Sequence, residues 1–188
     1  MSNILKIISS APLSAKFGML VVLIYSIVAI FAPFIAPYGE REILGRSFEL
    51  WSEKYPLGTD NLGRDMLSRM IFGARNTIGL ALSITILAFL LGGLTGMIAA
   101  ALGGWVDQIL SRIVDVLMSI PSLIFALLIL SIFGTSVPYL IATITVIDAT
   151  RVFRLARATA MNVVVMDYVE VARVRGEKLD WVIRKEIL

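Results

Sequence analysis

The sequence contains neither cysteine nor histidine. Without cysteine there is no disulfide and no thiol nucleophile, and without either residue the usual zinc sites are excluded. The absence of histidine also removes the commonest general base and proton relay. Charged residues are scarce, at 16% against about 25% in soluble domains, whereas hydrophobic residues reach 58%. This composition predicts an all-α integral membrane protein whose main partner is the lipid bilayer, and it carries no indication of nucleic-acid binding.

The apolar residues are gathered into stretches that predict membrane-crossing helices. The first stretch is followed by no A-x-A cleavage site and is longer than the core of a signal peptide, so an uncleaved helix is favoured over a cleaved signal. Pro121 predicts a kink in the third helix because proline removes a backbone N–H donor and clashes with the preceding turn. The four expected crossings are residues 17–37, 77–104, 112–133 and 138–150.

The placement of the basic residues predicts the orientation in the membrane, because lysine and arginine collect on the cytoplasmic side. The segments expected inside hold eleven lysines and arginines, against six in residues 38–76. We therefore expect residues 1–16 to be a cytoplasmic N-terminus and residues 38–76 to be extracytoplasmic. Residues 77–188 form the core, with residues 161–188 as a cytoplasmic loop.

The outer segment contains PLGTDNLGRDMLSR, from Pro56 to Arg69. Its glycines and proline predict a loop, and Thr59 or Asp60 is a candidate cap for a short helix that begins near residue 61 or 62. A short interfacial helix over residues 65–72 is also expected. One interpretation is a structured loop whose aspartates and arginines pair with each other. The other is a surface offered to a partner.

Gly92 and Gly96 form a G-x-x-x-G pair in the second crossing. Small residues at this spacing allow close approach of two helices, so we expect the pair in a helix contact, either within the chain or between chains. At the start of the next helix, Arg112 and Asp115 are close enough in sequence to pair on one face.

Asp148 is a carboxylate in the fourth expected crossing, near its expected cytoplasmic end and three residues before Arg151. Ionisable groups within spans are functional candidates, but they also pair locally at the interface. Two hypotheses follow: an ion pair with Arg151, or a site of ion coupling in transport.

The last segment combines many charges with a helical apolar stripe, which predicts an amphipathic helix over residues 163–175. Gly176 is the expected break, because glycine adopts the left-handed conformation that ends helices, and a second short helix follows over residues 178–187. A docking element, a membrane-surface helix and a solvated linker all fit this pattern.

Three motifs together resemble one family. EVARVRG, at residues 170–176, resembles the E-A-A-x-x-x-G element of ABC importer permeases, with Glu170, Ala172 and Gly176 matching and Val171 at the middle alanine. The outer loop and GGWVDQILSRIVDVLMSIPSL, at residues 103–123, resemble the second permease subunit of dipeptide, oligopeptide and nickel importers.

The resemblance implies a helical bundle of the type I importer permease kind in the bacterial inner membrane. Four of the usual six crossings are expected, since the sequence stops at Leu188, where such permeases continue. The residues implied in coupling to an ATPase are Glu170, Val171, Ala172, Gly176 and Asp180.

The implied partners are a second homologous permease, two ATP-binding cassette subunits and an extracytoplasmic solute-binding protein. The chain lacks the G-x-x-x-x-G-K-[ST] phosphate loop, so it is expected to be no enzyme and to hold no cofactor or metal, with ATP bound by the partner. The solute and its contact residues stay undetermined. A stand-alone ion-coupled carrier using Asp148 is the alternative, and a membrane hydrolase is disfavoured because no G-x-S-x-G stretch is present.

Overall fold

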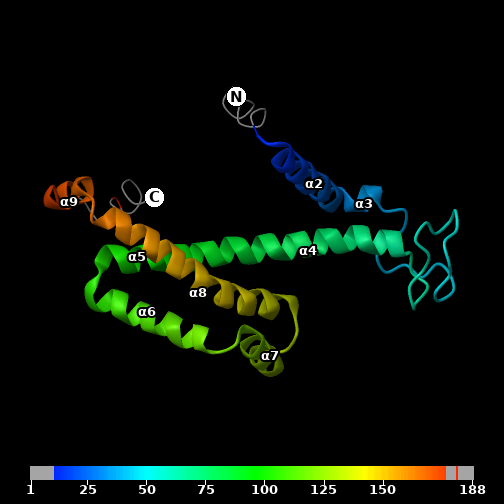
Figure 1. Cartoon of the computed structure of the whole chain (residues 1–188). Coiled ribbons are helices and arrows are strands. Elements are labelled where there is room, and N and C mark those ends of the chain that lie inside the picture. The colour runs from blue at the N-terminus through cyan, green and yellow to red at the C-terminus, as the bar shows by residue number, and fades with distance from the viewer. Residues whose placement is uncertain (1–10, 177–180, 182–188) are drawn as a thin grey trace. The chain divides into compact units, whose positions relative to one another are not determined.

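The computed structural model describes residues 11–176 and residue 181, and this part of the chain is helical, with two isolated bridges and no named strand (Figure 1). The expected all-α fold is confirmed. The chain divides into two compact units, residues 1–80 and residues 81–188, which are described separately below.

The first unit begins with α2 (Leu13–Ile30) and the single turn α3 (Ala32–Ile35). Pro12 is extended and directly precedes α2, so the helix begins four residues earlier than residue 17, where the sequence suggested. The helix is interrupted at Phe31, and Pro33 lies in the first turn of α3. Proline is tolerated there because the first N–H groups of a helix have no intrahelical acceptor.

α4 (Met66–Ala88) carries the chain from the first unit into the second. The expected short helix over residues 65–72 and the crossing expected from residue 77 form one continuous helix. The sequence suggested Thr59 or Asp60 as the cap, but the residue that caps α4 is Asp65. Its Oδ2 accepts the N–H of Ser68 at 2.7 Å. The side chain thereby satisfies a free donor of the first turn.

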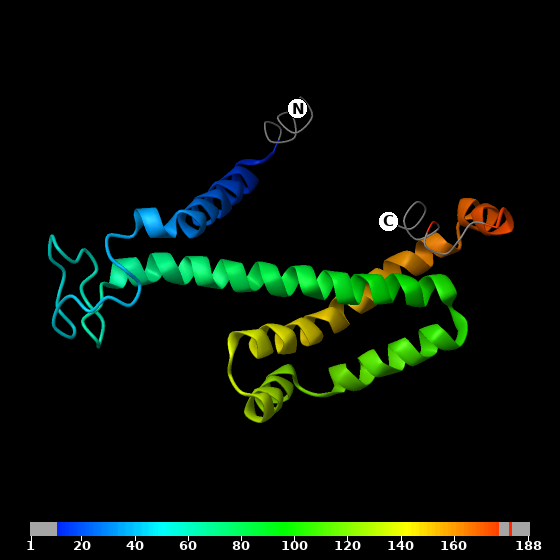
Figure 2. The same ribbon diagram turned by 180° about the vertical axis from the view of Figure 1, so that it is seen from behind.

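In the second unit, α4 continues through one π-helical stretch, η1 (Phe89–Gly93), into α5 (Leu94–Leu102). α8 (Val137–Val164) packs along both η1 and α5 (Figure 2). α6 (Gly104–Ser119) returns beside α5 after a turn at Gly103. α6 therefore starts well before residue 112, because Gly103 adopts a positive φ of 61° and redirects the chain at once.

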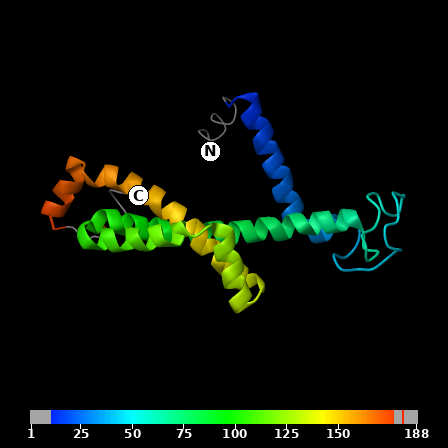
Figure 3. The ribbon, with the colours of Figure 1, turned by 60° about the horizontal axis from the view of Figure 1, so that its bottom comes forward.

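α6 and α7 (Ser122–Phe133) form a broken pair. Their axes differ by 89° across Ile120 and Pro121, so Pro121 produces a break rather than the expected kink within one helix. α7 projects away from α5 and α6 in Figure 3. Ile120 is extended, as expected for a residue that precedes proline.

Two helices of the described chain are long and apolar enough to cross a membrane, Leu13–Ile30 and Met66–Leu102, and the broken pair of α6 and α7 counts as a third if it is one span. The expected number was four. α8 is not counted by this measure, because its apolar part stops at Ile147 and is followed by Asp148, Arg151 and Arg154, and the four expected crossings stay a prediction. These charges face other helices or solvent and interrupt the run that a bilayer requires.

α8 extends to Val164 instead of stopping near residue 150, because no proline or glycine follows Pro138 in this stretch. Val165 and Met166 separate it from α9 (Asp167–Val174), so the expected helix over residues 163–175 is two helices. Gly176 has a φ of 81°, the left-handed conformation expected for a glycine that ends a helix. The second tail helix, at residues 178–187, falls outside the described residues apart from Trp181.

Candidate functional site: the α8 and α9 linkage and the outer loop

Gly92 in η1 and Gly96 in α5 lie directly against the backbone of α8. A Cβ added to Gly92 would be 2.3 Å from the carbonyl oxygen of Ala149, and one added to Gly96 would be 2.7 Å from that of Phe153. The neighbouring Gly93 has no such contact within 4 Å. Gly92 and Gly96 thus mark the line along which α8 approaches the long helix, and this contact is within the chain.

α6 is joined to the second half of α8 by two ion pairs. Arg157 makes a bidentate contact with Asp107, through Nε to Oδ1 and through Nη2 to Oδ2 at 2.5 Å. Arg154 lies nearer the middle of α8, and its Nη2 is 3.2 Å from Oδ1 of Asp115. The Asp107 pair is half-buried, whereas the Asp115 pair is largely exposed. A bidentate guanidinium–carboxylate pair fixes orientation as well as distance, so it ties α8 to α6 most firmly at Asp107.

These pairs correct one prediction and confirm another. Asp115 contacts Arg154 instead of Arg112, its neighbour in sequence, so the expected pair on a single helix is wrong. Asp148 does pair with Arg151, with 3.0 Å between Oδ1 and Nη1, and both side chains are exposed. The structure therefore favours the local ion pair over the ion-coupling site at Asp148.

A cavity of about 170 Å³ lies where the break between α6 and α7 faces α8. Its walls are mainly apolar, and Arg151 supplies the one charged group of the lining. The break therefore leaves room beside α8 for a group about the size of one side chain. The lining includes Ile120, Pro121, Phe125, Ile147, Thr150 and Arg151.

α9 carries the residues expected in coupling. Val169 is completely buried, whereas Val171 and Val174 are exposed, so α9 has one packed side and one open side. Glu170 and Ala172 belong to this helix, and Gly176 follows it. Asp180 lies outside the described residues. Only Val165 and Met166 separate α8 from α9, so the connection between the two helices is short.

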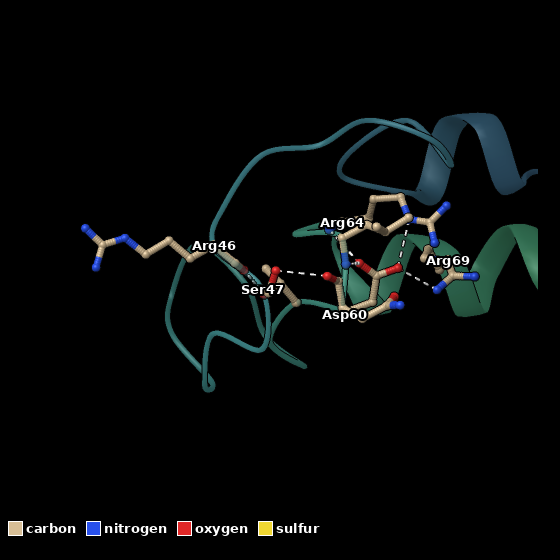
Figure 4. Close-up of polar contacts among 8 residues, drawn as sticks. Arg46, Ser47, Asp60, Arg64 and Arg69 are labelled. Atoms are coloured by element: carbon tan, nitrogen blue, oxygen red, sulfur yellow. Dashed lines mark hydrogen bonds and ion pairs between the residues drawn. The ribbon is translucent and has the colours of Figure 1, made fainter.

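In the first unit, the PLGTDNLGRD stretch folds around Asp60 (Figure 4). Oδ1 of Asp60 accepts the N–H groups of Leu62 and Arg64, at 2.8 and 2.9 Å. Oδ2 accepts hydrogen bonds from Nε–H of Arg64 at 2.8 Å and from Nη1–H of Arg69 at 2.6 Å. The prediction that aspartates and arginines of this segment pair with each other is confirmed. We call Asp60, Leu62, Arg64 and Arg69 the Asp60 cluster.

Thr59 and two glycines hold together the segments of the outer loop that flank the Asp60 cluster. The hydroxyl of Thr59 donates to the carbonyl of Arg46 at 2.6 Å and accepts the N–H of Glu49 at 2.8 Å. Gly58 and Gly63 have φ values of 72° and 74°, and a Cβ on Gly63 would be 2.1 Å from a backbone oxygen. No larger residue fits there, so this loop has a defined conformation.

The carboxyl of Asp60 is strongly acidic. Burial by itself raises its pKa, but the backbone N–H groups of Arg64 and Leu62 and the Arg64 guanidinium outweigh this effect and lower the pKa to about 2. Asp60 therefore stays ionised at all physiological pH values and keeps its four hydrogen bonds. The sequence motif indicated a loop, but the choice of Asp60 as its centre emerges only from the fold.

Within residues 11–176 no group of three or more acidic side chains gathers to hold a metal ion. The fold instead combines lipid-length apolar helices, a broken helix pair and a short amphipathic helix. These features define a polytopic helical membrane protein.

The chain belongs to a transport family. The family described as "Binding-protein-dependent transport system inner membrane component" matches residues 92–188, and "N-terminal TM domain of oligopeptide transport permease C" matches residues 14–46. The resemblance inferred from the EAA-like motif and the outer loop is thereby confirmed.

Several transport permeases are similar to this chain. The dipeptide transport system permease protein DppC of Haemophilus influenzae is 34% identical over 169 residues, covering 86% of this chain and 57% of the relative. The di/tripeptide permease DppC of Pseudomonas aeruginosa is also 34% identical, over 85% of this chain and 55% of the relative. The glutathione permease GsiD of Pectobacterium atrosepticum is 29% identical, over 88% and 55%. The chain thus spans a little over half the length of these relatives.

Proposed function

We propose that this chain is a permease subunit of an ATP-driven importer that carries peptides or related small solutes across the cytoplasmic membrane. It would work with a second homologous permease, two ATP-binding cassette subunits and an extracytoplasmic solute-binding protein. Family membership and the similarity to peptide and glutathione permeases support this assignment. The chain would not hydrolyse ATP itself, since it has no phosphate-binding loop.

The observation that carries the proposal is the position of the E-x-A-x-x-x-G motif on a short helix directly after α8. α9 has an exposed side for docking, and it is followed by the left-handed Gly176. We infer that α9 docks on an ATP-binding cassette subunit, so that nucleotide-driven movement of that subunit displaces α9.

α8 would transmit this displacement to the rest of the second unit. Its close contact at Gly92 and Gly96 prevents it from separating freely from the long helix. The bidentate pair between Arg157 and Asp107 holds α6 to the same half of α8. A shift of α9 would therefore move α8 and α6 together, which is the mechanical requirement for switching a solute path between two sides of a membrane.

The coupling role is tested in the assembled transporter in membrane vesicles. Glu170→Ala and Gly176→Pro should abolish solute uptake and the stimulation of ATPase activity while leaving membrane insertion intact. Proline at position 176 is incompatible with the positive φ there, because its ring restricts φ to about −65°.

Two matched variants control for damage to the helix. Val174→Ala lies on the same helix, at an exposed and variable position of the motif, and Val171→Ala introduces the alanine usual at the middle motif position. Both should transport normally. Normal uptake by Glu170→Ala would exclude the coupling role, and equal losses in all four variants would reduce it to a general need for α9.

The N-terminus and α9 are proposed to lie in the cytoplasm, and the Asp60 cluster outside, on the basis of the charge distribution. The solute-binding protein that acts with this permease would set most of the solute preference. Measuring which solute that protein binds is the direct route to the transported compound.

A further inference from the structure

The outer loop exposes a compact apolar tip, residues 48–51. Its three large apolar side chains are mostly exposed: 73% for Phe48, 88% for Leu50 and 75% for Trp51. The one charged residue of the tip, Glu49, is turned back into the loop, where its Oε1 accepts the N–H of Arg46 at 2.8 Å. The tip therefore presents an apolar surface, and large apolar side chains gathered in this way indicate an interaction surface.

The apolar tip is held in a defined backbone conformation. Phe48 is the one described non-glycine residue with a positive φ, 56°, a conformation that bulky residues rarely adopt. Its N–H donates to the carbonyl of Asp60 at 3.0 Å, and the carbonyl of Glu49 accepts the N–H of Thr59 at 3.0 Å. These bonds fasten the tip beside the Asp60 cluster, and strain maintained by surrounding hydrogen bonds is typical of functional positions.

The base of the outer loop lies at the edge of the apolar layer formed by α2 and α3. Phe34 and Ile35, at the end of α3, are exposed and continue the apolar surface of α2. Tyr38 follows Ile35 by three residues, and its N–H donates to Oγ of Ser68 in the first turn of α4, at 3.1 Å. The start of α4 and the base of the loop are therefore level with the end of an apolar helix.

Tyr38 also holds the segment that follows the apolar tip. Its hydroxyl donates to the carbonyl of Lys54 at 3.3 Å, and its ring packs against that of Tyr55, with 6.0 Å between the ring centroids. Trp51 precedes Lys54 by three residues, so their Cα atoms are at most about 11 Å apart. The polar layer of a leaflet is about 5–8 Å deep, and the long side chains of the tip span part of that distance. The tip is thus within reach of the boundary between lipid headgroups and acyl chains.

We propose that the apolar tip is a lipid anchor: Phe48, Leu50 and Trp51 enter the boundary between the headgroups and the acyl chains of the adjoining leaflet. Tryptophan favours this depth because its ring is apolar and its N–H is polar. Such an anchor fixes the height of the outer loop relative to the bilayer. The inference rests on the apolar helices of the first unit, and it requires neither the proposed transport function nor a particular orientation of the chain.

The charged residues beside the tip suit lipid headgroups. Arg46 and Lys54 are exposed, and the side chain of Arg46 extends away from Asp60 in Figure 4. Glu53 is the one exposed acid within residues 46–54, so the exposed cations outnumber it. Basic side chains beside an inserted apolar group strengthen binding to anionic lipids, because they pair with the phosphates. Lipid therefore matches both chemistries of this surface, apolar at the tip and cationic beside it.

The test uses the complete transporter, with any cysteines of the partner subunits replaced, in vesicles of phosphatidylethanolamine and phosphatidylglycerol. This chain has no cysteine, so Leu50→Cys or Asn61→Cys carries a single nitrobenzoxadiazole fluorophore. Asn61 is the control position, because it is exposed on the same loop but is polar and lies outside the tip. Quenching of the fluorophore is measured with lipids that carry a spin label near the headgroup, and with iodide in the water on both sides of the membrane.

We expect lipid quenching at position 50 to exceed that at position 61 by at least about 2-fold, and iodide quenching to show the reverse order. Replacing the neighbouring anchors, with Phe48→Ser and Trp51→Ser, should lower lipid quenching at position 50 toward the value at position 61. All labelled variants should assemble with the same subunits.

Three results would overturn the proposal. The first is the same quenching by lipid and by iodide at positions 50 and 61. The second is a fluorophore at position 50 that neither quencher reaches, because the tip is then covered by protein, either another permease or a soluble partner. The third is unchanged lipid quenching at position 50 after both anchors are replaced, because the fluorophore and not the tip then causes the insertion.

Discussion

Exchanging Gly92 for alanine should weaken the contact between the long helix and α8, whereas the same exchange at Gly93 should not. The new methyl group at position 92 would lie 2.3 Å from the oxygen of Ala149 and 2.9 Å from the nitrogen of Phe153. Both obstacles are backbone atoms, so no side chain can rotate away. α8 would have to retreat by about 1 Å to restore an ordinary separation of about 3.5 Å.

Overpacking of this kind costs about 1–3 kcal/mol. Gly93 has a helical backbone and open space around its Cα, so alanine there should stabilise the helix by about 0.5–1 kcal/mol. The two neighbouring exchanges therefore have opposite expected signs. Gly96→Ala should behave like Gly92→Ala, because its methyl group would be 2.7 Å from the oxygen of Phe153.

The assay is thermal unfolding of the purified chain in detergent, with solute uptake by the complete transporter as a second readout. Gly92→Ala and Gly96→Ala should lower the unfolding midpoint, and Gly93→Ala should leave it unchanged or raise it slightly. Equal midpoints for Gly92→Ala and Gly93→Ala would refute the close approach of α8. A lowered midpoint for Gly93→Ala alone would refute the register of the contact.

Three further outcomes are expected. Asp107→Asn should lower the free energy of unfolding by about 1–3 kcal/mol, because it breaks a half-buried bidentate pair. Asp148→Asn, at an exposed pair, should change the free energy of unfolding by less than about 1 kcal/mol. Equal effects of the two variants in unfolding experiments would contradict the different burial of the two pairs. The pKa of Asp60 is lowered from 3.8 to about 2, so the contribution of its carboxylate to stability is present above pH 3.8 and is lost as the pH falls toward 2. Hydrogen exchange of residues 38–65 should accelerate over that pH interval. The Asp60→Asn variant should show no such acceleration. The chain has no cysteine of its own, so single cysteines can be introduced at Asn61 and Lys178 and labelled with a thiol reagent. The cysteine at position 61 should react from the outside, and the one at position 178 only after permeabilisation. The reverse pattern would invert the proposed orientation.

Much of the helical framework could be predicted because its causes are local. The long apolar runs near Leu20 and Ile84 favour a lipid environment, and in lipid their backbone groups must be hydrogen-bonded within a helix. This holds for any arrangement of the other helices. The interruption at Pro121, although expected as a kink, and the left-handed Gly176 follow from the backbone preferences of single residues. The Asp and Arg pairing of the outer loop was also expected, because the two residue types alternate over a short distance.

The errors arose where an outcome depends on which segments meet. The cap was assigned to Thr59 or Asp60, but the fold places Asp60 at the centre of the outer loop and gives the capping role at the start of α4 to Asp65. Asp115 was assigned to Arg112, three residues away, but pairs with Arg154, which is 39 residues distant. The apolar start of α8 predicts a crossing from contiguous residues, whereas the contact of its charged second half with α6 depends on the fold.

The sequence by itself determined that this chain is a helical membrane protein of the permease family, since hydrophobicity, helix-breaking residues and the spacing of the EAA-like motif are properties of contiguous residues. Only the tertiary structure decided that Gly92 has no room for a methyl group while Gly93 does, that Arg157 meets Asp107, and that Phe48 is strained and exposed. Clearance, ion pairing and strain depend on atoms supplied by distant segments, and they exist only once those segments are packed together.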